Sequence, residues 1–395
     1  MDIENLGIRI LSDKGIKQAL DMGLIKTTPA FDYNIDSKRV QSATLDVRLL
    51  EVDEVEAISH RHEQEKNENF VQSFSPKKKN SFHERSISTI KLTEIIDFGQ
   101  LGAPHENNFL GVTSEARSTV RLYGCYIPNC GYFHTSENNS QIEIGNFSQN
   151  QIHFSEGDRV AQLLFSVDPF DDKRMEDIIK PSQSQIQMGE MVRSLDVGME
   201  VVDSNQIMML QLKGFLKVSP VLAFIDDFLV VHASDKAYRM KKIDGGIDFA
   251  NRKKYSKEDL LEPINISKGY TVRPFEHIII ETQESFELSK HIGIRFWDNL
   301  FLYNQTLNKR KHLSTPLKAA KNVPVMGITD GWIDPGYSGG FSRQPKWLEN
   351  RTIHPGDVVG FGQVFFFPNG VGTKYGNFRL GSQYNNAKNI RFSKS

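Results

Sequence analysis

The sequence predicts a mainly β protein of two tandem domains with few short helices. Its 395 residues are more than one small core needs and fit two domains comfortably. Short segments in which apolar residues alternate with polar ones recur between turn residues, a pattern typical of β-strands. A loose repeat between segments 155–165 and 354–366 is consistent with duplication of one β domain, although two similar segments can also arise by chance.

The first predicted domain, residues 1–170, opens with a short helix. Ser12 is placed to cap this helix and Gly23 to end it. Between them, the apolar face of the helix is supplied by Ile16, Ala19 and Leu20.

Strands are predicted after this helix. Apolar residues occupy every second position of segment 41–49, which indicates a half-buried strand. The other short β segments of this half are residues 141–144, 151–154 and 159–165. A polar insertion near residues 59–86 has few aliphatic side chains and predicts a loop with little fixed structure.

A change in composition predicts a linker at residues 171–205, followed by a second domain at 206–395. Like the first domain, the second contains short strand-like segments between turn residues. Its strand-like segments are residues 221–231, 276–280 and 364–367.

Composition also excludes several classes of protein. No apolar run approaches the length that spans a bilayer, and the first residues lack the features of a signal peptide, so we expect a soluble, cytoplasmic protein without a membrane partner. The formal net charge of -1 gives no basic field for nucleic acid. Two cysteines, Cys125 and Cys130, cannot build a disulfide framework.

The first candidate site is Arg117-Ser118-Thr119, close to Gly124. A guanidinium provides forked donors and the hydroxyls provide adaptable ones, a combination that suits a phosphate chain. The alternative is a polar strand end with its charges in solvent.

The second candidate is the glycine-rich segment 331–340, which contains Asp334 and Tyr337. Its proline and glycines predict a tight hairpin that brings the backbone close to a ligand. Asp334 could then orient a water molecule and Tyr337 could stack on a sugar or base. The alternative is an ordinary β-turn.

Two further candidates depend on their surroundings. Glu143 lies on a predicted strand, and burial in a pocket would raise its pKa and suit it to acid–base catalysis, whereas such a residue is usually exposed and inert. The cationic, aromatic tail could close over a polyphosphate, although termini are often simply mobile. Its candidate residues are Lys374, Tyr375, Ser382 and Tyr384.

Recognised nucleotide and metal motifs are missing from the sequence. It has no Walker loop and no Gly-x-Gly-x-x-Gly segment. The two cysteines do not have the spacing of a zinc deaminase, so any deamination would be metal-free at the reacting carbon, and no protein metal ligands are expected.

In order along the chain, these segments resemble the dUTPase/dCTP deaminase superfamily, and specifically its double-length bacterial dCTP deaminase branch. Segment 42–49 resembles the family's first strand, residues 117–119 its phosphate motif, 157–162 its domain-closing strand, 331–339 its nucleoside hairpin, and the tail its counterpart in double-length members. The resemblance implies two tandem dUTPase-like domains of β-barrel or jelly-roll type. It also implies active sites between domains, where one supplies the phosphate motif and the other the hairpin.

The sequence departs from the family at one position. Deaminases of this type carry a glutamate about ten residues after the hairpin aspartate, and here that position is Gln344, which cannot act as a base. The first half keeps a candidate for this glutamate in Glu143, but without its hairpin. The resemblance therefore leaves three functions open: dCTP deamination with Glu143 as base, which we place first; dUTP diphosphatase activity with Asp334 aligning water; and nucleotide or partner binding without turnover. Mg²⁺ held by the substrate triphosphate is expected in both reactions, and a homo-oligomer is the expected assembly.

Overall fold

The computed structural model describes residues 8–57, 80–97, 110–127, 133–135, 140–167, 190–225, 228–274, 276–297, 329–345, 347 and 350–373. The predicted mainly β class is confirmed: strands dominate both halves, and the helices are short. No helix in these ranges has both the length and the apolar character that crossing a membrane requires. We call the elements up to β12 the front domain and those from β13 onward the rear domain.

The front domain carries its helices mainly near its start. Its helical elements are α1 (Asp13–Asp21), α2 (Tyr33–Asp36), η1 (Ser37–Arg39) and α4 (Ser118–Leu122). Its strands are β1 (Arg9–Leu11), β2 (Lys26–Thr28), β3 (Leu45–Ala57), β4 (Ser81–Phe82), β5 (Ser86–Leu92), β6 (Ile95–Asp97), β7 (Leu110–Ala116), β8 (Cys125–Tyr126), β9 (Phe133–Thr135), β10 (Ser140–Asn146), β11 (Ile152–His153) and β12 (Arg159–Val167).

The rear domain has the same general character. Its helical elements are α7 (Ser204–Leu212), η2 (Arg252–Lys254) and α8 (Lys257–Leu260). Its strands are β13 (Val197–Val201), β14 (Leu216–Ser219), β15 (Ala223–Ile225), β16 (Phe228–Met240), β17 (Ile247–Asp248), β18 (Leu261–Asn265), β19 (Tyr270–Val272), β20 (Ile278–Leu288), β21 (Ile292–Trp297), β22 (Thr329–Ile333), β23 (Ser338–Arg343), β24 (Arg351–Ile353) and β25 (Val358–Phe366).

The predicted N-terminal helix is confirmed as α1. The Ser12 side chain accepts a hydrogen bond from the Gly15 backbone N–H at 3.1 Å, as an N-cap should. Gly23, with φ of 71°, follows the helix in the left-handed region that glycine adopts readily. Ile16 and Ala19 are fully buried, so the helix packs its apolar face onto the front core.

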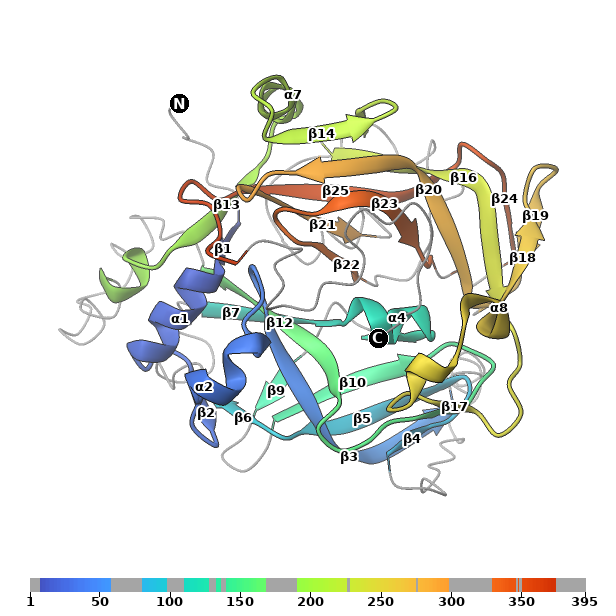
Figure 1. The fold of residues 1–395 in the computed structure, drawn as a ribbon, viewed down its shortest axis with the longest axis horizontal. Coiled ribbons are helices and arrows are strands. Elements are labelled where there is room, and N and C mark those ends of the chain that lie inside the picture. The colour runs from blue at the N-terminus through green and yellow to red at the C-terminus, as the bar shows by residue number, and fades with distance from the viewer. Residues whose placement is uncertain are drawn as a thin grey trace, which may run out of the picture.

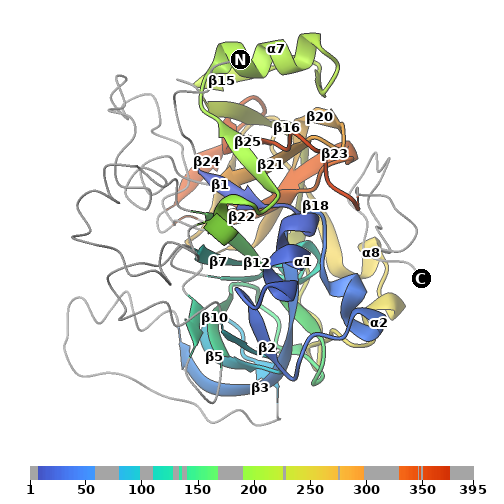
Figure 2. The same ribbon diagram turned by 90° about the vertical axis from the view of Figure 1, so that its left-hand side faces the viewer.

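Each domain has its own core between paired strands. In the front domain β12 lies between β3 and β7, and β5 joins β3 to β10. In the rear domain β25 lies between β16 and β21, and β20 pairs with β14, β16 and β23. Figure 2 shows the rear strands above the front strands, with α1 between the two levels.

A seam of strands joins the domains into one sheet. β1 pairs with β12 of its own domain and also with β13 of the rear domain, which in turn pairs with β25. β13 and the start of α7 fall inside the predicted linker 171–205. The end of that segment is therefore ordered structure, because β13 pairs with both β1 and β25. A small apolar cluster that includes Ala43 of the front domain and Trp332 and Phe365 of the rear domain fills the space beside it.

The polar insertion predicted near 59–86 is partly strand. Residues 58–79 lie outside the described ranges, whereas β4 and the first residue of β5 are paired strand. Ser81 and Phe82 are fully buried, because β4 pairs with β11 at the base of the front domain (Figure 1).

Candidate active site

The predicted phosphate motif lies where β7 gives way to α4. Arg117 has extended backbone angles, and Ser118 and Thr119 open the helix. The Arg117 side chain is about a quarter exposed, and its Nε lies 3.4 Å from Oδ1 of the buried Asp46 on β3. Arg117 is therefore held by Asp46 on one side while part of its guanidinium side chain remains accessible to solvent.

The predicted hairpin turn is present between β22 and β23. Tyr337 N–H donates to the Asp334 carbonyl at 3.1 Å, and Gly336 has φ of 86°, which completes a tight turn that begins with Pro335. Tyr337 is buried in the rear core, and its hydroxyl donates to the Gly340 carbonyl. In this structure Tyr337 thus supports the hairpin, and its predicted stacking on a sugar or base stays a prediction.

The hairpin and the front domain meet within one chain. The Ser42 hydroxyl, from the segment before β3, donates to Asp334 Oδ1 at 2.9 Å, and the Trp332 indole N–H donates to the same oxygen at 3.1 Å. A Cβ atom on Gly331 would overlap the guanidinium of Arg121, so this arginine of α4 lies directly against the backbone of β22. Figure 1 shows α4 beneath β22 in the middle of the molecule.

This junction changes the acidity of Asp334. Burial raises the pKa of its carboxyl to about 6, and the negative charge of Asp46 acts in the same direction. The hydrogen bonds from Ser42 and Trp332 and the charge of Arg117 lower that pKa. Asp334 is therefore a carboxylate that can accept a proton near neutral pH, and it senses the arginine of the phosphate motif.

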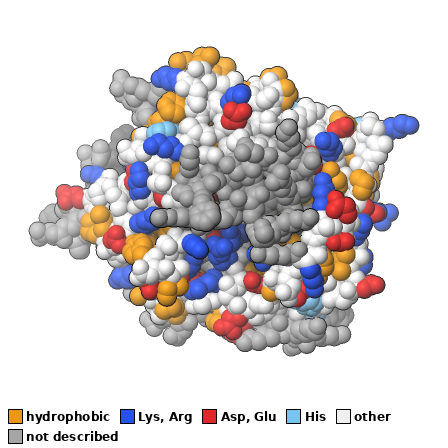
Figure 3. Space-filling model, viewed as in Figure 1, with side chains coloured by type: hydrophobic (Ala, Val, Ile, Leu, Met, Phe, Trp, Pro, Cys, Tyr) orange, Lys and Arg blue, Asp and Glu red, His pale blue; other side chains and the backbone are white. Residues whose placement is uncertain are grey.

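Asp46 organises a second arginine that we had not assigned to the site. Arg159, the first residue of β12, places Nη1 3.1 Å from Asp46 Oδ2, while Arg117 approaches Oδ1. Burial raises the pKa of Asp46, and Arg117 and Arg159 oppose that shift. Asp46 alone therefore faces two guanidiniums. Figure 3 shows a group of Lys and Arg side chains just below the middle of the face that is seen in Figure 1.

The remaining candidates are Glu143, the neutral Gln344 and the tail. Glu143 lies opposite Thr89 in the β10–β5 pair and is half-buried. Its side chain makes no hydrogen bond or ion pair with the described residues, including those of this junction. Gln344 is buried, and its amide donates to the Ser342 hydroxyl at 3.3 Å. The tail residues lie outside the described ranges; they are Lys374, Tyr375, Ser382 and Tyr384.

The repeat motif reveals a pair of equivalent positions at the domain interface. Gln162 of β12 pairs with Glu115 of β7, and Gln363 of β25 pairs with Arg295 of β21. Glu115 and Arg295 therefore occupy corresponding places in the two domains. They form a buried ion pair with each other, with Arg295 Nε 2.7 Å from Glu115 Oε1.

The same register shows what stands at the second copy of the site. Two residues beyond this ion pair, Arg117 of the front domain corresponds to Trp297 of the rear domain. Asp46 of β3 pairs with Gln162 in the front domain. In the rear domain Leu229 of β16 pairs with Gly362, so the preceding residue, Phe228, lies opposite Gln363 and occupies the position that corresponds to Asp46. Phe228 and Trp297 are buried together with Phe361. The second position is therefore filled by aromatic side chains.

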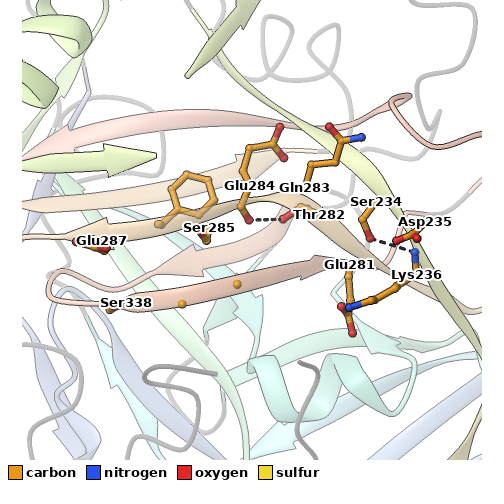
Figure 4. A pocket seen from close by; sticks show the side chains of 13 residues that line it. Ser234, Asp235, Lys236, Glu281, Thr282, Gln283, Glu284, Ser285, Glu287 and Ser338 are labelled. Atoms are coloured by element: carbon orange, nitrogen blue, oxygen red, sulfur yellow. Dashed lines mark hydrogen bonds between the residues drawn. The ribbon is translucent and has the colours of Figure 1, made fainter. Parts of the chain in front are cut away.

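A cavity of about 460 Å³ lies elsewhere in the rear domain, between β16, β20 and β23. It forms where β16 and β20 depart from regular register (Figure 4). The buried carboxylate of Glu284 is already held by the His232 backbone N–H at 2.9 Å and by the His232 ring at 2.7 Å. Neither Arg117 nor Asp334 lines this cavity, so we do not place the active site there.

The protein supplies no evident metal-binding cluster in the part of the chain that the structure describes. Both oxygens of Asp46 face arginines, and Oδ1 of Asp334 accepts two hydrogen bonds. This donor set does not resemble a dedicated metal cage, although Mg²⁺ often binds mainly through substrate phosphates and water.

Two kinds of residue escaped the sequence interpretation. Asp46 and Arg159 stand inside segments that resemble the family, so a signal was present but carried no role. Ser42 also lies in such a segment, but its contact could not be predicted, because its partner Asp334 lies 292 residues away.

Comparisons with known proteins agree with the fold. No protein-family model matches the sequence, and no curated protein matches it. Among solved structures, the chain is similar to the 2'-deoxycytidine 5'-triphosphate deaminase from Agrobacterium tumefaciens, with a TM-score of 0.57 and 14% sequence identity. The likeness covers 92% of this chain and 98% of that one, so it supports a dUTPase/dCTP deaminase-like fold over nearly the whole length.

Proposed function

We propose that the protein hydrolyses a deoxypyrimidine nucleoside triphosphate at one composite site per chain. The observation that carries the proposal is the junction of the Asp334 hairpin with the front domain, where Ser42 bonds the carboxylate and the charge of Arg117 acts on it. In this scheme Arg117, Ser118 and Thr119 bind phosphates, and the hairpin holds the nucleoside.

The geometry favours release of diphosphate from dUTP. Asp334 would take a proton from water, whose oxygen attacks the α-phosphorus while the bond to the bridging oxygen breaks, giving dUMP and diphosphate. Its raised pKa suits a base that works near neutral pH. Arginine and hydroxyl donors would stabilise the charge that develops on the phosphoryl oxygens.

Deamination of dCTP to dUTP is the second candidate. It is favoured by Glu143 and by the likeness to a solved structure of a dCTP deaminase. Gln344, which is neutral and hydrogen-bonded to Ser342, argues against it. Glu143 would have to act as the base at some distance from the junction or from another copy of the chain in a homo-oligomer.

Three further elements belong to the proposal. Mg²⁺ would be carried by the substrate triphosphate and would neutralise part of its charge. The tail residues would close over the bound phosphates as a lid; they are Lys374, Tyr375, Ser382 and Tyr384. Tyr337 would hold the hairpin in shape and would stack on the sugar or base.

Separation of the products after incubation with Mg²⁺ and either dUTP or dCTP tests the proposal. Formation of dUMP and diphosphate supports the first reaction, and formation of dUTP from dCTP supports the second. Asp334→Asn should abolish the first, whereas Glu143→Gln should affect only the second. Binding titrations should give one nucleotide per chain, because aromatic residues fill the second position. Tight binding without any product would indicate a binding protein and refute the hydrolase.

A further inference from the structure

Part of the rear domain is built into the front domain. Residues 241–256, which we call the arm, follow β16 and precede α8 and β18, and they pack against the front domain (Figure 1). Within the arm, β17 pairs in parallel with β11. Ile247 and Phe249 are buried in the front core, so the arm is anchored on the front domain.

Phe249 positions an arginine of this arm. Arg252 donates from Nη1 to the Phe249 carbonyl at 3.0 Å, and its guanidinium carbon lies 4.6 Å from the centre of the Phe249 ring. The Phe249 ring packs edge-on against Tyr123, with 5.5 Å between ring centres, and at a tilt against Phe154, with 4.6 Å between ring centres. Tyr123 directly follows α4, and Phe154 precedes the turn that leads into β12. The guanidinium is therefore held near both elements that carry the site's arginines.

The charges of these arginines act on one another. Burial lowers the pKa of Arg159, and the positive charges of Arg117 and Arg252 lower it further against the opposing effect of Asp46. The charge of Arg252 also reaches Asp158 in the turn before β12. Repulsion among cations is unfavourable unless an anion joins them. Arg252 Nε is buried without a hydrogen-bond acceptor among the described residues, so the cluster retains donor capacity.

We propose that Arg252 is a substrate-binding residue that completes a three-arginine cluster with Arg117 and Arg159, and that this cluster binds the outer phosphates of the nucleoside triphosphate. The inference rests on the proposed function and extends it to specificity. Guanidinium groups from the start of α4, from β12 and from the arm would converge on one anionic chain, so recognition should depend on the number of phosphates. The rear domain thereby contacts both ends of the substrate, through the hairpin and through the arm.

Calorimetric titration of Arg252→Ala with dUTP, dUMP and inorganic triphosphate tests this assignment. Loss of one charge-assisted contact should weaken binding of dUTP and inorganic triphosphate roughly 10- to 100-fold and leave dUMP within about twofold. Lys254→Ala is the matched control, because Lys254 lies in the same short helix with an exposed side chain and should bind like the wild type. Arg252→Gln retains a hydrogen-bond donor for the Phe249 carbonyl but removes the charge. If this variant loses as much affinity as Arg252→Ala, the effect is due to the lost charge, even if the alanine variant folds poorly.

The outcomes separate the two proposals. Wild-type affinity for dUTP in both Arg252 variants would overturn the assignment, whatever the protein catalyses. Binding of inorganic triphosphate that depends on Arg252, together with no turnover of any nucleotide, would support the cluster and refute the hydrolase. Failure of the wild-type protein to bind either triphosphate would overturn both.

Discussion

Removal of the Ser42 hydroxyl should shift the pH dependence of turnover without changing its maximum. Ser42→Ala deletes the hydrogen bond of 2.9 Å to Asp334 Oδ1, one of the contacts that lower the pKa of this carboxyl from the level that burial imposes. The wild-type carboxyl titrates at about 6. Because Asp334 must be ionised to accept a proton, the wild-type rate should fall as the pH drops through that value.

The size of the shift follows from the hydrogen bond. A bond to a charged group contributes roughly 1.5–3 kcal/mol, and one pKa unit corresponds to about 1.4 kcal/mol. Because Trp332 still donates to the same oxygen, we take the lower bond energy, about 1.5 kcal/mol, which corresponds to about one pKa unit. The pKa of Asp334 should then rise from about 6 to about 7. At pH 6.5 the ionised fraction then falls about threefold, whereas at pH 8.5 it changes by only a few per cent.

The assay is the rate of dUTP hydrolysis between pH 5 and pH 9, with circular dichroism confirming that the variant is folded. Trp332→Phe keeps an aromatic ring but removes the second donor, so its acid limb should move in the same direction. Titration of the isotope-labelled Asp334 carboxyl by NMR gives the pKa without turnover. An unchanged carboxyl pKa in both folded variants, or an equal loss of rate at every pH, would refute this account of the site.

The remaining predictions concern stability. Asp334→Asn should abolish dUTP hydrolysis yet stabilise the protein. The pKa of Asp334 is higher in the folded state than in the unfolded state, so ionisation of this carboxyl destabilises the fold. The cost is about 2–3 kcal/mol above pH 7 and vanishes below about pH 4, where the carboxyl is protonated in both states. Urea unfolding at pH 8 and pH 4 should show the gain only at pH 8, and a gain at both would contradict it. Arg295→Met should lower the free energy of unfolding by about 3–5 kcal/mol, because it leaves Glu115 buried and unpaired at the domain interface. Adding Glu115→Leu should recover part of this loss in the same measurement, whereas additive losses would show that the pair is not coupled.

Short-range signals in the sequence were sufficient for the local structure. The two ends of α1 could be predicted from the Ser12 cap and the left-handed Gly23, because each acts within a few residues of a helix end. Alternation predicted β3, where Leu45, Val47 and Leu49 are all buried. The Pro-Gly turn after Asp334 likewise depends only on its own residues, so the hairpin could be predicted as well.

Alternation also predicted that the other face of β3 would be polar and exposed, and there the tertiary structure differs. Asp46 is fully buried because the arginines of α4 and β12 cover it. A strand's own sequence cannot show whether a second layer will cover its polar face.

The composite character of the site was decided by contacts between distant parts of the chain. Ser42 meets Asp334 across 292 residues, and the arm carries Arg252 from the rear domain to the front one. Such contacts depend on how two folded domains pack, because no local propensity links residues so far apart. The sequence by itself determined the strands, the helix and the turn that present the chemical groups; only the packing of one domain on the other decided which of those groups share a site.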